Sequence, residues 1–374
     1  MALGTTIGSL GAFVEPIRQD FGWTGEQMGS ALTAFVLAMA AILPMAGLLV
    51  DRIGARVVMT CGTVLIATSY GLASRSQTLT ALVAGFAATG AGLGAATYVP
   101  CTVVISEWVP DRRGLALGVL LAVSAVGATL LPIAIAPLVR DHGWRPVMAG
   151  IACLNLLIGL PIILALARRG THGHEKRPIS GGGPPLPELM RGRTFRLVTL
   201  VLVLSQLSFY GIYFHLIPFL TDLGFPESKA VLFYSGSALA TFAGSMVLGP
   251  LIDRFGPRRV LIAALSVLVF GCLLLPGIDT SSAGIAVGVA FSVLWGAVVN
   301  SPLQFAPILL ADAAGPGNLG TLLGLSNFLT GLVSAFGPVL TGAIHDATQS
   351  YMTAFGLSAV IAALSIVPAL RLPK

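Results

Sequence analysis

Residues 47–56 read GLLVDRIGAR, and residues 249–258 read GPLIDRFGPR. The two stretches carry glycine, aspartate, arginine, glycine and arginine at the same spacing, and each follows a long apolar run. Their aspartates, Asp51 and Asp253, lie 202 residues apart, which is close to half of the 374-residue chain. A repeat at this offset predicts a chain built from two similar halves, an arrangement typical of membrane transporters.

Composition indicates that most of the surface faces lipid. Hydrophobic residues make up 55% of the chain and charged residues only 10%, and the mean hydropathy is +0.91. A soluble globular domain carries about 25% charged residues. A spanning helix needs about 20 apolar residues, so the chain has room for a dozen. We expect an all-α membrane protein of twelve transmembrane helices in two pseudo-symmetric six-helix bundles.

Apolar runs bounded by glycine, proline or charged turns define these spans. They lie at 1–19, 27–50, 57–74, 79–106, 113–139, 146–167, 196–220, 229–252, 258–277, 284–311, 319–343 and 351–370. The hydrophilic stretch between the sixth and seventh reads as a flexible linker. The predicted domains are therefore a bundle over 1–167, a cytoplasmic linker over 168–194 and a bundle over 195–374.

The first predicted span is short. Its apolar run ends at Val14, and 14 residues cover about 21 Å against a hydrocarbon core of about 30 Å. Either the helix continues through Glu15 and Pro16 to about Gln19, or the true start lies upstream of Met1. The N-terminus has no basic region and no cleavage site, so we expect no signal peptide.

Basic residues predict the orientation. Sixteen of the 21 lysines and arginines fall in one alternate set of loops, together with the linker and the C-terminus. The positive-inside rule places these segments, and both termini, in the cytoplasm of a cell (inner) membrane protein. The net charge of +6 is then a topology signal, and we expect no nucleic-acid partner.

No pattern of catalytic or metal-binding residues stands out. Cys61, Cys101, Cys153 and Cys272 lie singly in apolar segments, which favours small hydrophobes over a disulfide or redox role. The chain has no HExxH, GxSxG or phosphate-binding loop motif. We therefore expect no enzyme activity, no metal and no cofactor, with a small-molecule substrate and the lipid bilayer as partners and a monomeric state.

The repeated loop resembles the signature of the major facilitator superfamily. Three looser stretches resemble its monocarboxylate porter and oxalate–formate antiporter branch: WVPDRRGLALG at 108–118, HGWR at 142–145, and the segment from Gly337 to Tyr351. A second repeat is a pair of glycines four residues apart, Gly114 and Gly118 in the first half of the sequence and Gly320 and Gly324 in the second half. The resemblance covers nearly the whole chain and implies alternating access.

The resemblance also implies a conformational latch, by which we mean contacts that close one face of the protein in one state and break in the other. Asp51 would meet a helix N-terminus of the opposite half, where partial positive charge resides, and arginines would pair with the acid at 107. The latch residues are Asp51, Arg52, Arg56, Glu107, Asp253, Arg254 and Arg258. The alternative is that these charges only set topology in a solvated loop.

Polar groups within a bilayer are costly and mark candidate substrate contacts. The candidates are Tyr98, Ser124, Gln206, Tyr210, His215, Asn300, Gln304 and Asn327. His215 could bind an anionic substrate or take up a coupling proton, or it could be a histidine bonded to a neighbouring helix. His345, beside Asp346 at a predicted outer helix end, reads as a cap or gate contact.

One feature departs from the monocarboxylate branch, in which a basic residue of the eighth span holds the anion. Here that stretch, residues 241–249, contains none, and Ser245 stands near the expected position. Three options stay open: a neutral substrate, an anion held by hydroxyls, amides and His215, or a cation. The predicted spans also lack an acid at mid-depth, which argues against the cation.

The sequence thus favours a secondary transporter of small organic solutes, with a monocarboxylate or related organic anion and proton coupling as the leading hypothesis. The first alternative is an exporter of drug-like or apolar metabolites. The alternative of another class is a non-transporting membrane sensor on the same fold, which the short linker disfavours.

Overall fold

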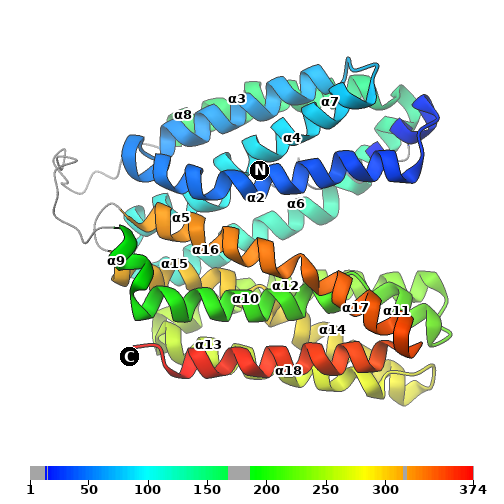
Figure 1. Ribbon diagram of the computed structural model, residues 1–374, viewed down its shortest axis with the longest axis vertical. Coiled ribbons are helices and arrows are strands. Elements are labelled where there is room, and N and C mark those ends of the chain that lie inside the picture. The colour runs from blue at the N-terminus through cyan, green and yellow to red at the C-terminus, as the bar shows by residue number, and fades with distance from the viewer. Residues whose placement is uncertain (1–12, 15, 167–185, 315–317, 374) are drawn as a thin grey trace. The chain divides into compact units, whose positions relative to one another are not determined.

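The computed structural model is described for residues 13–14, 16–166, 186–314 and 318–373. Within these ranges the secondary structure is helical and contains no strand (Figure 1). Ten helical segments are long and apolar enough to cross a membrane: Gln27–Ile53, Ala55–Ala73, Leu79–Trp108, Trp144–Ala165, Arg193–Tyr213, Glu227–Phe255, Pro257–Gly277, Ser282–Ala311, Leu319–Thr348 and Tyr351–Leu370. The all-α membrane class is therefore confirmed.

The count of twelve spans stays a prediction. Residues 113–142 form one helix of 30 residues, α6 (Arg113–His142), of which Arg113–Gly127 is a shorter apolar helix. The first predicted span, 1–19, falls mostly outside the described residues, although residues 16–21 are helical. The linker over 168–194 also lies mostly outside them, and its described end begins with the short helix α9 (Leu186–Arg191).

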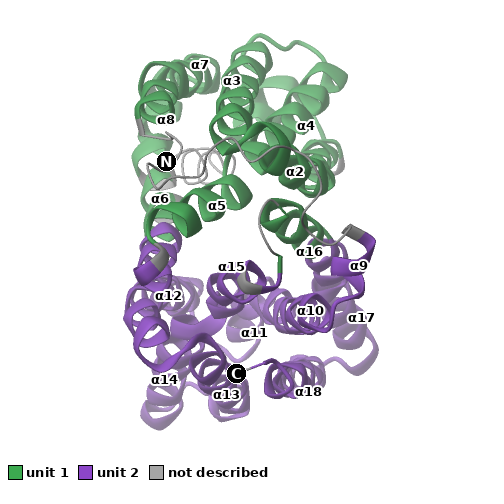
Figure 2. Cartoon of the chain, turned by 90° about the vertical axis from the view of Figure 1, so that its left-hand side faces the viewer, with its two compact units in different colours: residues 1–110, 123–184, 314–328 green, residues 111–122, 185–313, 329–374 purple. Residues whose placement is uncertain are grey.

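The chain forms two compact units (Figure 2). Unit 1 comprises residues 1–110, 123–184 and 314–328, and unit 2 comprises 111–122, 185–313 and 329–374. Each unit therefore takes a helical piece from the other half of the sequence: unit 1 takes the start of α16 (Leu319–Ser334), and unit 2 takes the start of α6. Residues 1–167 and 195–374 form the first and second halves of the sequence, and their organisation as two domains stays a prediction.

Unit 1 contains α2 (Gly25–Ile53), α3 (Ala55–Ala73), α4 (Leu79–Ala96), α5 (Tyr98–Trp108), α7 (Trp144–Leu154), the π-helical segment Asn155–Gly159 and α8 (Leu160–Leu166). It also contains residues 123–142 of α6 and the helical residues 16–21. Unit 2 contains α9, α10 (Arg193–Tyr213), α11 (Leu216–Asp222), α12 (Glu227–Phe255), α13 (Pro257–Leu274), α14 (Ser282–Val299), α15 (Ser301–Ala314), α17 (Phe336–Thr348) and α18 (Tyr351–Leu370). It also contains residues 329–334 of α16. The described residues also form two 3₁₀ turns, Pro110–Arg112 and Leu275–Gly277.

The repeated loop folds in the same way twice. Gly54 ends α2 and begins α3 with φ of 92°, and Gly256 ends α12 and begins α13 with φ of 84°. Backbone at such positive φ strains a residue that carries a Cβ, which explains the glycine at this position of both repeats. At the other end of α2, Thr24 and Gln27 form a capping box.

Four predicted continuous helices are interrupted in the structure. Thr97, with φ of −113° and ψ of −101°, separates α4 from α5, and Asn300 separates α14 from α15. His215 and Ala335 mark the other two breaks, before α11 and before α17. Asparagine is unfavourable inside a helix, because its side chain competes for backbone hydrogen bonds, and this helps to explain the break at Asn300. The apolar pattern of the sequence continues across all four positions and therefore did not predict the breaks.

The HGWR turn organises one end of unit 1. Gly143, with φ of 80°, separates α6 from α7. Trp144 donates from Nε1 to Asp20 Oδ2 at 3.1 Å, and Arg145 Nη2 lies 3.2 Å from the same oxygen. The Arg145 guanidinium also lies over the Trp144 ring, 4.3 Å from its centroid. Below this turn, Met148 packs into a core with Phe86 and Tyr70.

Large apolar side chains cover the outside of many helices. Leu72, Leu157, Leu232 and Val339 are between 67% and 75% exposed. Exposed apolar surface on this scale is unfavourable in water and suits contact with acyl chains.

Candidate functional site

Asp51 binds the N-terminus of a helix from the other half of the sequence. Its carboxylate accepts hydrogen bonds from the backbone N–H groups of Gly320 at 2.9 Å and Thr321 at 2.6 Å. The Thr321 hydroxyl donates a third, at 2.6 Å. These donors lie in the first turn of α16, whose N–H groups have no partner within the helix and carry partial positive charge. The contact, within unit 1, is therefore charge-assisted.

Asp253 makes the corresponding contact within unit 2. Its Oδ1 accepts from the N–H of Gly114 at 2.9 Å, and its Oδ2 accepts from the N–H of Leu115 at 3.1 Å. Both donors lie in the first turn of α6, which comes from the first half of the sequence. The two aspartates of the repeat thus occupy the same kind of site, each at the N-terminus of a helix from the opposite half.

Glycines bring the backbones together at both contacts. A Cβ on Gly47 would lie 2.1 Å from the Gly320 carbonyl oxygen, and one on Gly324 would lie 2.3 Å from the Leu43 carbonyl oxygen. In unit 2, a Cβ on Gly118 would lie 2.3 Å from the Ser245 carbonyl oxygen. Side chains at these positions would separate the helices, so small residues are required for each aspartate to reach its donors.

The last arginine of each repeated loop, Arg56 or Arg258, binds the end of another helix. Arg56 donates from Nη2 to the carbonyl of Leu164 in the last turn of α8, at 2.7 Å. Arg258 donates in the same way to the carbonyl of Leu370, the last residue of α18. The C-terminal carbonyls of a helix favour a cation, so each arginine ties its loop to the last helix of its own half.

The other predicted latch residues are Arg52, Arg254 and Glu107. Arg254 lies over the Phe255 ring, 5.2 Å from its centroid. Arg52 and Glu107 are exposed on α2 and α5. The predicted pairing of Arg52 and Arg56 with Glu107 stays a prediction.

Gln304, a predicted substrate-path residue, lies beside the contact of Asp253 with α6, and its place on the path stays a prediction. It is 1% exposed, and its Nε2 lies 3.0 Å from the Gly114 carbonyl oxygen and 3.3 Å from that of Ser245. It therefore bridges α6 and α12 beside Asp253. The sequence could not reveal this role, because the two carbonyls lie 190 and 59 residues from Gln304 along the chain.

The remaining path candidates divide between the units. Tyr98, Ser124 and Asn327 belong to unit 1, where Asn327 Nδ2 donates to its own helix at the Leu323 carbonyl, 2.8 Å away. Gln206, Tyr210, His215 and Asn300 belong to unit 2. Gln206 is 4% exposed, and its Oε1 has no hydrogen-bond partner among the described residues.

Tyr210, one of the unit 2 candidates, belongs to an aromatic cluster. Phe209 lies between Tyr210, Tyr213 and Trp295, with ring centroids 4.9, 4.8 and 5.5 Å away. Tyr234, on α12, donates from its hydroxyl to that of Tyr213. Trp295 is 1% exposed, and its Nε1–H has no oxygen acceptor among the described residues. Sequence reasoning missed Tyr234 because nothing along the chain links α12 to α10.

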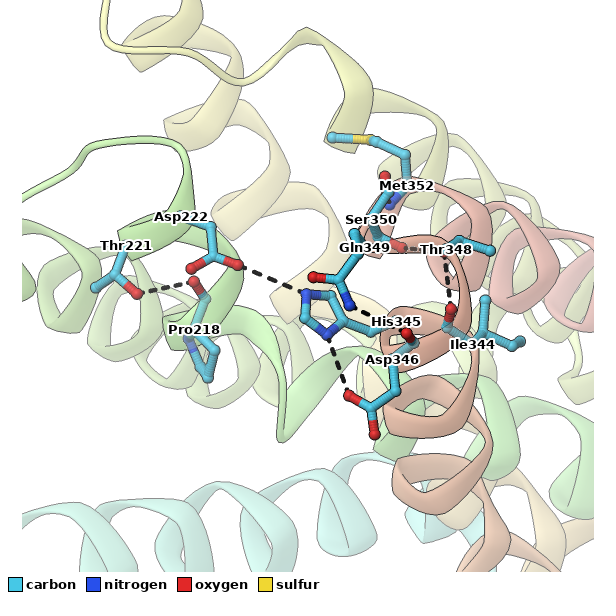
Figure 3. A network of polar contacts seen from close by, with 10 residues as sticks. All are labelled: Pro218, Thr221, Asp222, Ile344, His345, Asp346, Thr348, Gln349, Ser350 and Met352. Atoms are coloured by element: carbon cyan, nitrogen blue, oxygen red, sulfur yellow. Dashed lines mark hydrogen bonds and ion pairs between the residues drawn. The ribbon is translucent and has the colours of Figure 1, made fainter.

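His215 and His345 both lie against Tyr351 in unit 2. The His345 ring stacks on Tyr351 with centroids 4.0 Å apart, and the His215 ring lies 5.7 Å from the same tyrosine. Figure 3 shows His345 between two carboxylates: Nε2 lies 3.8 Å from Asp222 Oδ2, and Nδ1 lies 3.6 Å from Asp346 Oδ1. His345, on α17, therefore contacts residues of α11 and α18. Its predicted role as a cap or gate contact at an outer helix end stays a prediction.

The family model of the Major Facilitator Superfamily matches residues 1–302 and 232–374. The chain therefore belongs to this superfamily, and it is a multi-pass membrane transporter rather than an enzyme.

Curated relatives point to one branch of the superfamily. The chain is 27% identical to monocarboxylate transporter 13 of Bos taurus over 319 residues, covering 83% of this chain and 72% of that protein. It is also 27% identical to monocarboxylate transporter 11 of Homo sapiens over 371 residues, covering 96% and 75%. The predicted resemblance to the monocarboxylate branch is confirmed.

Solved structures share the fold. FucP, a superfamily transporter in the outward conformation, matches with a TM-score of 0.75 at 19% identity, covering 100% of this chain and 96% of that one. The human organic anion transporter MFSD10 (TETRAN) matches with a TM-score of 0.69, also at 19% identity, covering 97% and 89%.

Proposed function

We propose that this protein is a secondary active transporter that works by alternating access and carries a monocarboxylate or a related organic anion together with a proton. The observation that carries the proposal is the pair of repeat-related contacts of Asp51 and Asp253. Each joins a helix of one sequence half to the N-terminus of a helix from the other half. If the halves move past each other during transport, these contacts must form in one state and break in the other.

The energy of the contacts suits such a switch. A hydrogen bond to a charged group contributes about 1.5–3 kcal/mol, and charge at a helix terminus adds about 0.3–1 kcal/mol. Two such contacts bias a conformational equilibrium by a few kcal/mol, which differential binding of a substrate can overcome. In this proposal the latch closes the cytoplasmic face, both termini are cytoplasmic, and the protein acts as a monomer.

The proposed substrate class rests on the relatives named monocarboxylate transporters. Since the stretch 241–249 offers no basic side chain, the carboxylate would be held by neutral donors. The hydroxyl pair of Tyr213 and Tyr234 and the indole N–H of Trp295 are clustered in unit 2 and suit this task. Tyr210 would contribute a further hydroxyl. Several neutral hydrogen bonds can replace one cation at lower affinity.

The substrate test is uptake of labelled pyruvate into proteoliposomes that contain the purified protein. We expect saturable uptake that other short monocarboxylates inhibit, and a Tyr213→Phe plus Tyr234→Phe protein with KM raised about tenfold, because two hydroxyl donors are lost. The alternative is an exporter of drug-like or apolar metabolites, and the aromatic cluster is the observation that supports it. Transport of an amphipathic dye without any uptake of carboxylates would favour this alternative.

Proton coupling is assigned to His215, since imidazole titrates near physiological pH. An inward proton gradient should accelerate pyruvate uptake in the wild type, and His215→Gln should abolish this acceleration. His142→Gln is the matched control, because His142 is exposed at the end of α6. Wild-type uptake that does not respond to the gradient would eliminate the coupling.

A further inference from the structure

Unit 2 contains a pocket of about 550 Å³ at the start of α13. Its polar side is formed by Arg258, Arg259 and Thr194, and its apolar side includes Phe255, Ile262 and Leu309. The pocket thus places two guanidinium groups beside an apolar wall. This combination matches an amphiphile with an anionic head.

The position of the pocket corresponds to the lipid headgroup region. Three candidate spans have an end at the pocket. Arg193–Tyr213 begins beside the lining residue Thr194, and Pro257–Gly277 begins at the lining residue Pro257. Glu227–Phe255 ends at the lining residue Phe255. Leu309 and Ala313 line it at the end of Ser282–Ala311, and Pro373 follows the end of Tyr351–Leu370. Because five spans end around the pocket, it lies where the chain leaves the hydrocarbon core.

Arg259 has no role in the repeated loop. The repeat explains Arg258, because Arg56 makes the equivalent hydrogen bond to the end of α8. At the next position the first half has Val57 where the second half has Arg259. The extra charge, which is exposed at the pocket, is therefore particular to the second half.

Within the described part of the chain, neither Arg258 nor Arg259 forms an ion pair. The nearby carboxylate of Asp253 is occupied by the N–H groups of Gly114 and Leu115. Arg258 uses one Nη for the Leu370 carbonyl, and a guanidinium has five N–H donors. In addition, α13 begins without a side-chain cap, so the first-turn N–H groups add to the attraction for an anion.

We propose that this pocket binds the phosphate headgroup of an anionic phospholipid. The phosphate lies against Arg259, Arg258 and the start of α13, and an acyl chain lies against Phe255 and Ile262. Anionic lipids are concentrated in the cytoplasmic leaflet, and basic pockets at that level recognise their headgroups. This inference does not depend on which solute is transported.

The test is lipid retention by the purified full-length protein, measured by native mass spectrometry during titration with phosphatidylglycerol or phosphatidylcholine. Wild type should retain phosphatidylglycerol in preference to phosphatidylcholine. Arg259→Gln should weaken phosphatidylglycerol binding about fivefold, since one basic residue near the headgroups contributes roughly that factor. Arg259→Lys should retain most of the binding.

Arg254→Gln is the matched control, since Arg254 is an arginine of the same loop that does not line the pocket. It should change retention by less than about twofold. Equal losses in Arg254→Gln and Arg259→Gln would show general charge attraction and overturn the proposal, as would unchanged binding in Arg259→Gln. A separate arm adds millimolar inorganic phosphate: displacement of the lipid at that concentration would assign the site to free phosphate instead.

Discussion

At the scale of single residues, the repeated aspartate is the most informative group. Asp51 and Asp253 each place a carboxylate at a helix start that offers at least two N–H donors. A solvated loop charge that only set topology would need no such geometry, and arginine alone would serve that purpose. The contacts therefore favour the latch hypothesis over the topology alternative.

Replacing Asp51 with Asn should weaken its contact by about 1–3 kcal/mol, because an amide keeps one acceptor but loses the charge. A loss of about 1.4 kcal/mol changes a conformational equilibrium tenfold. We expect the initial rate of pyruvate uptake in proteoliposomes to fall about tenfold with protein yield retained. Asp141→Asn is the control, because the ion pair of Asp141 with Arg140 is exposed, at 56% and 80% for the two side chains. It should not change the uptake rate measurably. A tenfold loss of uptake in Asp141→Asn as well would remove the support for a latch.

Glycine offers a second test on one helix. Gly324 and Gly331 both lie on α16, but a Cβ at Gly324 meets the Leu43 carbonyl at 2.3 Å whereas one at Gly331 meets nothing within 4 Å. Gly324→Ala should lower the free energy of unfolding by about 1–3 kcal/mol through overpacking. Gly331→Ala should be neutral or slightly stabilising, because alanine favours helix. Thermal unfolding of the purified proteins measures both, and equal midpoints would contradict the close packing of α2 and α16.

At the scale of elements, each loop of the repeat joins three helices. It connects two successive spans through a glycine at positive φ, and its arginine ties that turn to the end of α8 or α18. Each turn is thus attached to the last helix of its own half. In the latch hypothesis, the aspartate of the turn then binds the opposite half in one conformational state only.

This arrangement predicts unequal effects of two arginines on the same loop. Arg56→Gln should lower the midpoint of thermal unfolding by a few degrees, because the Leu164 carbonyl loses a charged donor worth about 1–2 kcal/mol. Arg52→Gln, whose side chain is exposed, should shift the midpoint by less than about one degree. A larger shift from Arg52→Gln would show that the turn is held by other contacts.

At the scale of the whole molecule, the orientation in the membrane stays a prediction from the basic loops. The helix α12 provides a test with one residue at each end, Glu227 and Arg254, both exposed. In a protein whose four native cysteines are replaced, Glu227→Cys should react with an impermeant maleimide on intact cells. Arg254→Cys should react only after the cells are permeabilised. The reverse pattern would place the repeated loops outside the cell.

The sequence alone determined the membrane class, most of the span positions and the family. These follow from apolar runs, glycine and charged turns, and a repeat at half-chain distance, all of which are properties of neighbouring or regularly spaced residues. The sequence did not predict the four helix breaks at Thr97, His215, Asn300 and Ala335, because the apolar pattern continues across them.

Only the tertiary structure decided which groups meet. The partners of Asp51 lie 269 and 270 residues away along the chain. The two carbonyls that Gln304 contacts lie 190 and 59 residues away from it. Hydrogen-bond partners depend on the distance between atoms in space, which no local pattern encodes when the chain passes from one unit to the other and back.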